Sequence, residues 1–189
     1  MEIRPRLSPE EYAVVQRYRN NRETVPIPQQ APKILLFDIE TAPMKSFLWS
    51  IWQKGVQPDQ VTNDWFILTW AAKWLFDSKT MSEGLTAKEV RKESDSRILK
   101  GVWQLLDEAD IVIGHNSDKF DIPRLNTRFL INGMGPPLPY RSIDTLKVAR
   151  KFAFTSNRLD QINKTLGLPR KMETKFNYGR GVLMGMRKH

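Results

Sequence analysis

The sequence contains no cysteine, and this absence excludes several kinds of chemistry from its 189 residues. Disulfide bonds, zinc–thiolate sites and thiol nucleophiles all require cysteine. The chain also lacks an apolar run of roughly 18–20 residues, so no segment is predicted to span a membrane. Its N-terminal segment has no apolar core of the kind found in signal peptides. We therefore expect a cytoplasmic protein.

The composition is 40% hydrophobic and 27% charged, which is ordinary for one soluble domain. The net charge of +9 is unevenly distributed along the chain. Residues 1–30 hold five Arg and four Glu, residues 31–140 hold 13 basic and 14 acidic side chains, and residues 141–189 hold 12 basic and three acidic ones. A basic C-terminal quarter, including a tail at 171–189, is the expected footprint of a polyanionic partner such as nucleic acid. A solvated basic tail explains the charge equally well, and charge alone leaves both open.

The first 32 residues form a separate region in this interpretation. Ser8 and Glu11 have the spacing of a capping box, and Pro9 suits the first turn of a helix. A helix of roughly a dozen residues follows, which is too short to be stable without packing. The proline-rich stretch 24–32 then predicts an extended linker. The helix is equally consistent with a docking arm, a dimer contact or the remnant of a longer region.

Strands and helices alternate from residue 33 onward. Apolar patterning predicts strands at 34–37, 65–75, 111–114 and 142–146, and helices at 96–106, 123–130, 146–150 and 156–166. The run Ile34–Phe37 is continuously apolar, which predicts a strand buried on both faces. The alternation predicts a layered α/β domain with a partly parallel sheet over residues 33–170.

The chain has six tryptophans, and two interpretations compete for them. Aromatic rings interleaved with charge can stack on nucleobases. Most of these tryptophans, however, lie in apolar stretches with strand-like patterning, where packing is the usual explanation. Core packing is therefore the favoured interpretation for the set Trp49, Trp52, Trp65, Trp70, Trp74 and Trp103.

Two carboxylates follow the first apolar strand. Asp38 and Glu40 are two residues apart, so strand alternation places both side chains on one face of the sheet. Two carboxylates that share a face repel each other, and a divalent cation between them relieves that repulsion. Their hard oxygen ligands suit Mg²⁺ or Mn²⁺. Taken alone, the pair is more simply explained as acidic residues at a strand end that meets solvent.

A third carboxylate follows the predicted strand 111–114. The chain continues through His115 and Asn116 to Phe120 and Asp121, where a helix begins. Phe120 can anchor this turn in the core while Asp121 points toward the neighbouring strand. Helix capping is the simpler explanation for Asp121 alone. The two acidic segments together are much more specific than either one.

Together, these two acidic segments resemble those of a known family. The strings FDIETAP at 37–43 and IVIGHNSDKFDIPRL at 111–125 are similar to the first two motifs of the DEDD 3′–5′ exonucleases. The likeness covers roughly residues 33–170, and it is strongest to the polymerase-B-type exonuclease domains predicted in phages and bacteria. The resemblance implies an RNase H-like fold with a central mixed sheet flanked by helices.

The resemblance also implies a catalytic site. By position, it makes Asp38, Glu40 and Asp121 the catalytic residues and the ligands of two Mg²⁺ or Mn²⁺ ions. In two-metal sites one ion activates water and the other stabilises the departing oxygen. The implied reaction is hydrolysis of phosphodiester bonds at single-stranded 3′ ends, with DNA slightly favoured over RNA as the substrate.

Other positions acquire lesser roles from the same resemblance. Thr41 and Ala42 match positions that hold the terminal nucleotide, and Asn116 matches a residue beside the bound strand. Asp144 matches an acid that is common in the fold, and we interpret it as support for the metal ligands. Asp160 lies in the last predicted helix and is interpreted as a surface carboxylate.

The sequence departs from the family in its third motif. The family carries a fourth acid on a final helix, with a Tyr or His four or five residues before it that positions the attacking water. Here no Asp follows Asp160, and the only Glu is Glu173. We therefore expect a C-terminally incomplete fold, which either a truncated or frameshifted reading of a longer gene or a short protein that cleaves weakly would explain. The alternative hypothesis is a non-catalytic module on the same fold that binds nucleic acid or a partner.

Overall fold

A computed structural model describes residues 10, 13 and 31–169 of the chain. The chain divides into two compact units, Met1–Ala31 and Pro32–His189, and every element below belongs to the second. Of the predicted N-terminal helix, only Glu10 and Ala13 are described, and both are helical. The rest of that helix, its linker up to residue 30 and the basic tail lie outside the described residues. No helix in the described part is long and apolar enough to cross a bilayer.

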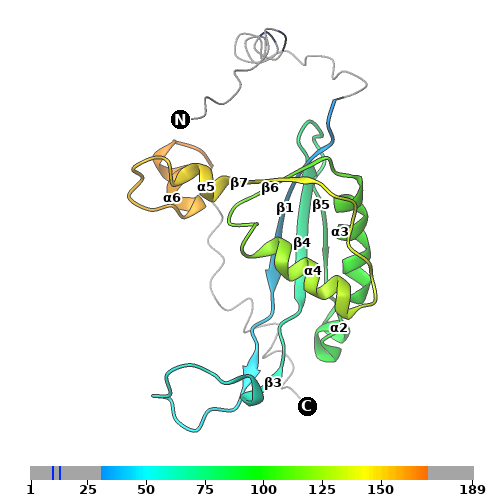
Figure 1. The fold of residues 1–189 in the computed structure, drawn as a ribbon, viewed down its shortest axis with the longest axis vertical. Coiled ribbons are helices and arrows are strands. Elements are labelled where there is room, and N and C mark those ends of the chain that lie inside the picture. Colours follow the sequence, from blue (N-terminus) through cyan, green and yellow to red (C-terminus); the bar gives the residue numbers. More distant parts are fainter. Residues whose placement is uncertain (1–9, 11–12, 14–30, 170–189) are drawn as a thin grey trace. The chain divides into compact units, whose positions relative to one another are not determined.

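A mixed sheet forms the centre of the second unit (Figure 1). Among the described residues its five strands are β1 (Ile34–Thr41), β4 (Ile67–Trp74), β5 (Met81–Gly84), β6 (Ile111–Gly114) and β7 (Arg141–Asp144). Their order in space is β5-β4-β1-β6-β7. The strands β1, β4 and β5 pair antiparallel, whereas β6 is parallel to both β1 and β7. The predicted mixed α/β sheet is therefore confirmed, with β1 at its middle.

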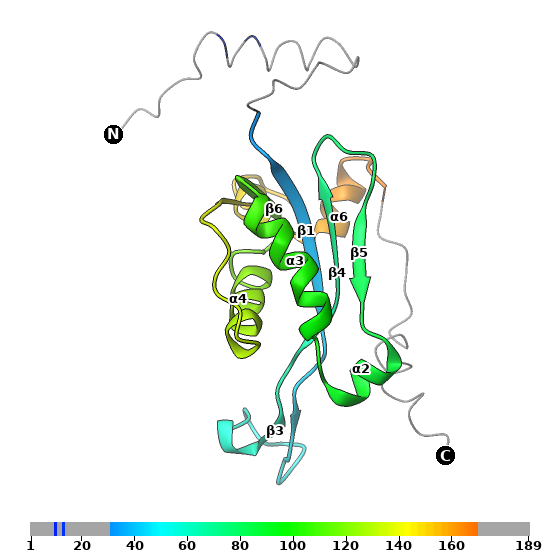
Figure 2. The ribbon, with the colours of Figure 1, turned by 90° about the vertical axis from the view of Figure 1, so that its right-hand side faces the viewer.

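Helices connect these strands and cover the sheet. They are α2 (Ala87–Lys92), α3 (Ser96–Glu108), α4 (Asp121–Ile131), α5 (Thr145–Ala149) and α6 (Leu159–Thr165). Figure 2 shows α3 and α4 on the same side of the sheet. A small separate hairpin pairs β2 (Lys45–Ser46) with β3 (Val61–Asn63), and the short helix η1 (Pro58–Gln60) precedes β3.

The core lies between the sheet and the two longer helices. Burial alternates along β1, where Leu35, Phe37 and Ile39 are buried whereas Asp38 and Glu40 are exposed. The predicted burial of β1 on both faces is therefore confirmed for one face only, because Ile34 and Leu36 on the other face are partly buried. The helices contribute the buried side chains Ile98, Leu99, Val102, Leu106, Leu125 and Phe129. The chemistry-bearing residues of β1 consequently lie on the face opposite to this core.

The tryptophans separate into two groups. Trp70 is buried, and Trp65, Trp74 and Trp103 are partly buried against the core, as the packing interpretation predicts. Trp49 and Trp52 are 93% and 83% exposed, so that interpretation is wrong for these two. Both lie in the loop between β2 and η1, where no element of the described structure covers them.

One buried acid ties three elements of the core together. Asp95, which precedes α3, has no exposed surface. Its carboxylate accepts two hydrogen bonds from the guanidinium of Arg128 on α4, at 2.7 and 2.8 Å, and one from the Ile67 amide of β4 at 3.0 Å. Asn132 donates a further one at 3.3 Å. Because both charges are paired and hydrogen-bonded, this contact fixes how α3 and α4 meet the sheet.

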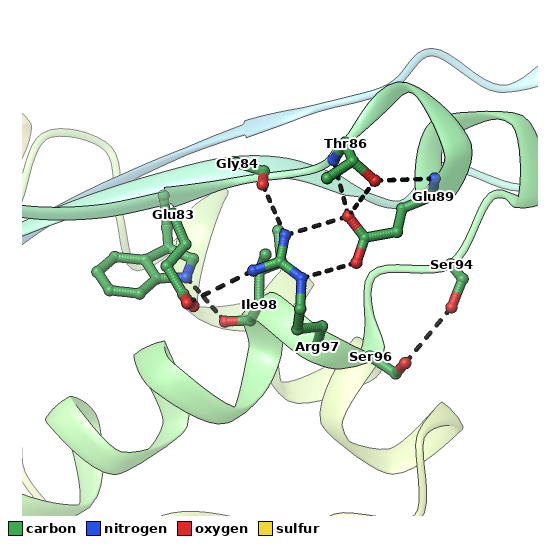
Figure 3. A network of polar contacts seen from close by, with 9 residues as sticks. Glu83, Gly84, Thr86, Glu89, Ser94, Ser96, Arg97 and Ile98 are labelled. Atoms are coloured by element: carbon green, nitrogen blue, oxygen red, sulfur yellow. Dashed lines mark hydrogen bonds and ion pairs between the residues drawn. The ribbon is translucent and has the colours of Figure 1, made fainter.

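A second polar cluster fastens the junction of α2 and α3 to β5 (Figure 3). Thr86 and Glu89 form a capping box at the start of α2. Arg97 donates to the Glu89 carboxylate at 2.7 and 3.1 Å and to the Gly84 carbonyl at 2.8 Å. These contacts lower the pKa of Glu89 to about 2, with the hydrogen bond from Arg97 as the largest cause. The cluster is exposed, and its role is to orient the junction.

Candidate active site

Strand β1 extends beyond its parallel neighbour, and this creates room for the site. The pairing of β1 with β6 ends at Leu36 opposite Ile113, whereas β1 continues to Thr41. On this unpaired stretch, Asp38 and Glu40 lie on the same exposed face, as strand alternation predicts. On its other side β1 remains paired with β4, with an irregularity in register between Glu40 and Thr41. Such irregularities re-aim side chains and are frequent beside active sites.

Asp121 reaches this stretch from the first turn of α4. Its Oδ1 accepts a hydrogen bond from the Ile39 amide at 3.1 Å, and its side chain is only 3% exposed. The Ile39 amide belongs to the part of β1 that has no β6 partner, so the carboxylate satisfies a donor that a longer β6 would otherwise occupy. Ile39 lies between Asp38 and Glu40. The structure thus brings the carboxylate of Asp121 to the backbone between the two other predicted acids.

The electrostatics of Asp121 reflect this position. Burial, followed by the negative charge of Asp38, raises the pKa of Asp121 from 3.8 to about 6. The hydrogen bond from Ile39 and the positive charge of Arg124 act in the opposite direction but are smaller. Negative charge is therefore concentrated here and only partly compensated by nearby protein groups.

The carboxylate oxygens of these residues are of a chemical type that suits a divalent cation. Buried and exposed carboxylate oxygens are the hard ligands that Mg²⁺ or Mn²⁺ prefers. Within the described part of the chain, however, no three His, Cys, Asp or Glu side chains are gathered closely enough to hold one ion. Asp38 and Asp121 interact electrostatically, and Glu40 lies one pleat further along β1. The three-ligand site therefore stays a prediction.

Thr41, the last residue of β1, and Ala42, which follows it, differ in burial. Thr41 is partly buried, whereas the Ala42 methyl group is buried in a small apolar cluster with Phe66 and Val90. The Ala42 amide donates to the Phe66 carbonyl at 2.8 Å. The packing of Ala42 fixes the direction in which the chain leaves β1. The predicted contact of these two residues with a terminal nucleotide stays a prediction.

Asp144, at the end of β7, is hydrogen-bonded to Asn116 in the turn that follows β6. Asn116 has a φ of 66°, a left-handed conformation that Asn tolerates better than most residues. Its amide donates to Asp144 Oδ1 at 2.7 Å, and the same oxygen accepts from the Leu146 amide at 2.9 Å as the cap of α5. Asp144 is buried, and these contacts show it holding the turn between β6 and Asp121. Its predicted support of metal ligands remains untested.

His115 has contacts that the sequence did not reveal. Its Nδ1 lies 2.9 Å from the Thr145 hydroxyl, and its Nε2 lies 2.9 Å from the Asn157 carbonyl oxygen. The imidazole therefore joins the turn after β6 to the segment before α6. An open hollow of about 550 Å³ adjoins it, lined by His115, Asn116, Leu146, Arg150, Ser156, Asn157, Arg158 and Leu159. Sequence spacing offers no signal for a contact between residues 42 positions apart.

Arg124 is a second residue that sequence reasoning missed. Its guanidinium lies over the Phe120 ring at 3.7 Å and near the Trp65 ring at 5.2 Å. Arginine prefers such stacking on aromatic faces. The signal was present in part, because Phe120 and Arg124 are four residues apart at the start of a helix, a spacing that brings side chains together. The result is a fixed cation one turn from Asp121.

These features agree with comparisons to known proteins. Residues 35–177 match the RNase_H superfamily, so the chain belongs to that superfamily. The predicted RNase H-like fold is thereby confirmed. The family B DNA polymerase of the hyperthermophilic archaeon Pyrobaculum calidifontis shares the fold with a TM-score of 0.58 at 18% identity. That match covers 86% of this chain but only 23% of the polymerase. A comparison with curated proteins gave no match.

Proposed function

We propose that this protein is a metal-dependent 3′–5′ exonuclease that hydrolyses phosphodiester bonds at nucleic acid 3′ ends. Membership of the RNase H superfamily supports a nuclease-type function and nucleic-acid binding. The observation that carries the finer proposal is the hydrogen bond from the Ile39 amide to Asp121, which holds one acid against the backbone between Asp38 and Glu40. The raised pKa of Asp121 supports the same proposal, because a bound cation would favour its ionised form.

The proposed residues have distinct tasks. Asp38, Glu40 and Asp121 would hold Mg²⁺ or Mn²⁺, which in such sites activates water and stabilises the leaving oxygen. Asp121 is oriented by the β1 backbone, so its position depends on the fold and not on the ligand. Asp144 holds the Asn116 turn in place by accepting a hydrogen bond from the Asn116 backbone amide.

The proposed substrate is a single-stranded 3′ end. The hollow beside Asn116 carries Arg150 and Arg158, whose positive charges suit a phosphate backbone. DNA is proposed ahead of RNA because the polymerase with the shared fold is a DNA polymerase.

The test is a time course on a 5′-labelled oligonucleotide with a 3′ overhang, with Mg²⁺ or Mn²⁺ and with EDTA. We expect stepwise shortening from the 3′ end that EDTA abolishes and that Asp38→Ala lowers roughly 10²-fold or more. Asp77→Ala is the matched control, since Asp77 lies in an exposed turn after β4. Shortening that survives Asp38→Ala would contradict the proposal.

The second candidate is a non-catalytic binding module on the same fold. It is favoured by the absence of a gathered three-acid group among the described residues. This hypothesis expects salt-sensitive binding of the same oligonucleotide without shortening in either metal. Asp38→Ala would then leave the affinity in EDTA unchanged.

A further inference from the structure

One segment next to the site exposes a large apolar surface. Residues 44–63, here called the aromatic arm, include β2, η1 and β3 and leave the sheet where β1 ends. Figures 1 and 2 both show this cyan segment extending away from the end of the sheet. Its exposed apolar side chains are Met44, Phe47, Leu48, Trp49, Ile51, Trp52 and Val56, with exposures of 46–93%.

The arm is ordered by polar contacts instead of apolar ones. At its base, Glu93 accepts a hydrogen bond from Asn63 at 2.8 Å and forms an ion pair with Lys45, so both strands of the hairpin are fastened to α2. Further out, Gln53 donates to Gln60 Oε1 at 2.7 Å. Because the backbone is held this way, the apolar side chains are free to face outward. The surface is therefore preformed and does not depend on a partner for its shape.

The area of this surface exceeds what a monomer usually exposes. An aromatic side chain has roughly 150–250 Å² of surface, so Phe47, Trp49 and Trp52 together expose on the order of 500 Å². The four aliphatic side chains add a further few hundred Å². Exposed apolar patches on monomers are roughly 300–600 Å², whereas each half of a standard interface buries about 800 Å². The arm thus has the size of one half of a protein interface.

The chemistry of the arm favours protein over nucleic acid. Binding of single strands combines aromatic stacking with a positively charged groove. The arm holds two Lys and one Asp, a net charge of only 2 − 1 = +1. One of those lysines, Lys45, is already paired with Glu93. Leu48 and Ile51 have no aromatic face to stack on a base, but both suit an apolar interface centred on Trp.

We propose that the aromatic arm is a self-association surface that pairs two copies of this chain. A largely apolar patch of low net charge is compatible with an identical patch, because a two-fold interface sets the same surface against itself and little charge repulsion opposes it. The area matches the half-interface that each copy must supply. This proposal is independent of the nuclease activity.

The first test is sedimentation equilibrium of the full chain from 1 to 100 μM, concentrations that span roughly micromolar affinity. We expect the mass to rise toward twice the 22.0 kDa of one chain. The double substitution Trp49→Ser, Trp52→Ser is expected to weaken dimerisation at least about 30-fold, since buried Trp residues dominate such interfaces. Leu130→Ser is the control, because Leu130 is a comparably exposed apolar residue on α4 outside the arm.

The second test uses the absence of cysteine from the chain. Ser50→Cys introduces one thiol between the two exposed tryptophans, and a short bis-maleimide is expected to give covalent dimers. Asn126→Cys, on the exposed side of α4, is expected to give few. A monomer at every concentration, or a dimer unaffected by the double Trp substitution, would overturn the proposal. If the monomer instead binds oligothymidine through these tryptophans, the arm is a base-stacking surface.

Discussion

Asp95 and Asp121 are buried aspartates of the same domain, but their surroundings compensate negative charge very differently. Asp95 meets both nitrogens of the Arg128 fork, the Ile67 amide and Asn132. Asp121 accepts a backbone hydrogen bond from Ile39 and lies near a second carboxylate, Asp38. The first arrangement pairs the negative charge within the fold, whereas the second disfavours the ionised form of Asp121, which a cation would stabilise. That contrast distinguishes a structural acid from a candidate ligand, although both side chains are almost fully buried.

The largest effect is expected from Asp95→Asn. This change leaves Arg128 buried without its anionic partner, which costs about 3–5 kcal/mol of unfolding free energy. Urea denaturation measures the loss. Asp77→Asn, in an exposed turn, is the control and should change the stability by less than about 0.5 kcal/mol. A small loss for Asp95→Asn would mean that the two aspartates are not different in kind.

Asp121→Asn is expected to lower activity while leaving the fold stable, the reverse of Asp95→Asn. It removes one proposed metal ligand and should lower the rate of 3′-end shortening roughly 10²–10³-fold. The Asn side-chain oxygen can still accept the Ile39 hydrogen bond, so the fold should be retained. The oligonucleotide assay and urea denaturation on the same preparation measure both quantities. A destabilised Asp121→Asn protein would identify Asp121 as a structural acid like Asp95.

The contribution of Asp121 to stability should depend on pH. Because the pKa of Asp121 is about 6 in the folded protein and 3.8 is its ordinary value, the unfolded chain loses this proton first as the pH rises. Its contribution to the free energy of unfolding is therefore greatest below about pH 4. This contribution decreases as the pH rises from about 4 to about 6, by about 3 kcal/mol in total.

The measurement compares unfolding of the wild type and Asp121→Asn in EDTA between pH 4 and 8. The difference should grow in favour of Asp121→Asn up to about pH 6 and then level off. Added Mn²⁺ should restore wild-type stability at pH 8 and leave the variant unchanged. A difference that is constant with pH would contradict the raised pKa.

The smallest effect is expected from Arg124→Gln. This substitution removes a cation that lowers the pKa of Asp121, so the pKa should rise further. It also removes the stacking on Phe120, worth about 0.5–1 kcal/mol. The midpoint of the pH-dependent stability difference should therefore move upward. An unchanged midpoint would show that Arg124 acts on Asp121 only through packing.

Much of this molecule was predictable, since its strongest signals are local. The strand at 111–114, the helix over 96–106 and the short strand followed by a helix near residue 144 all appear in the structure at or near their predicted bounds. The incorrect predictions concern how deeply particular side chains are buried. The apolar start of β1 predicted two buried faces, and the exposed Trp49 and Trp52 were assigned to the core. Residue type reports a preference for burial but does not supply the neighbour that provides it.

The sequence by itself determined four strands and four helices of the domain and the shared face of Asp38 and Glu40, because strand and helix periodicity depend on neighbouring residues alone, but it did not predict β5 or α2. Only the tertiary structure decided that Asp121 meets the Ile39 amide, 82 residues away, and that Asp95 meets Arg128. Both contacts depend on where β6 ends and how α4 packs on the sheet. Those are properties of the whole domain, and they decide which acid is paired with a cation and which lies near another carboxylate.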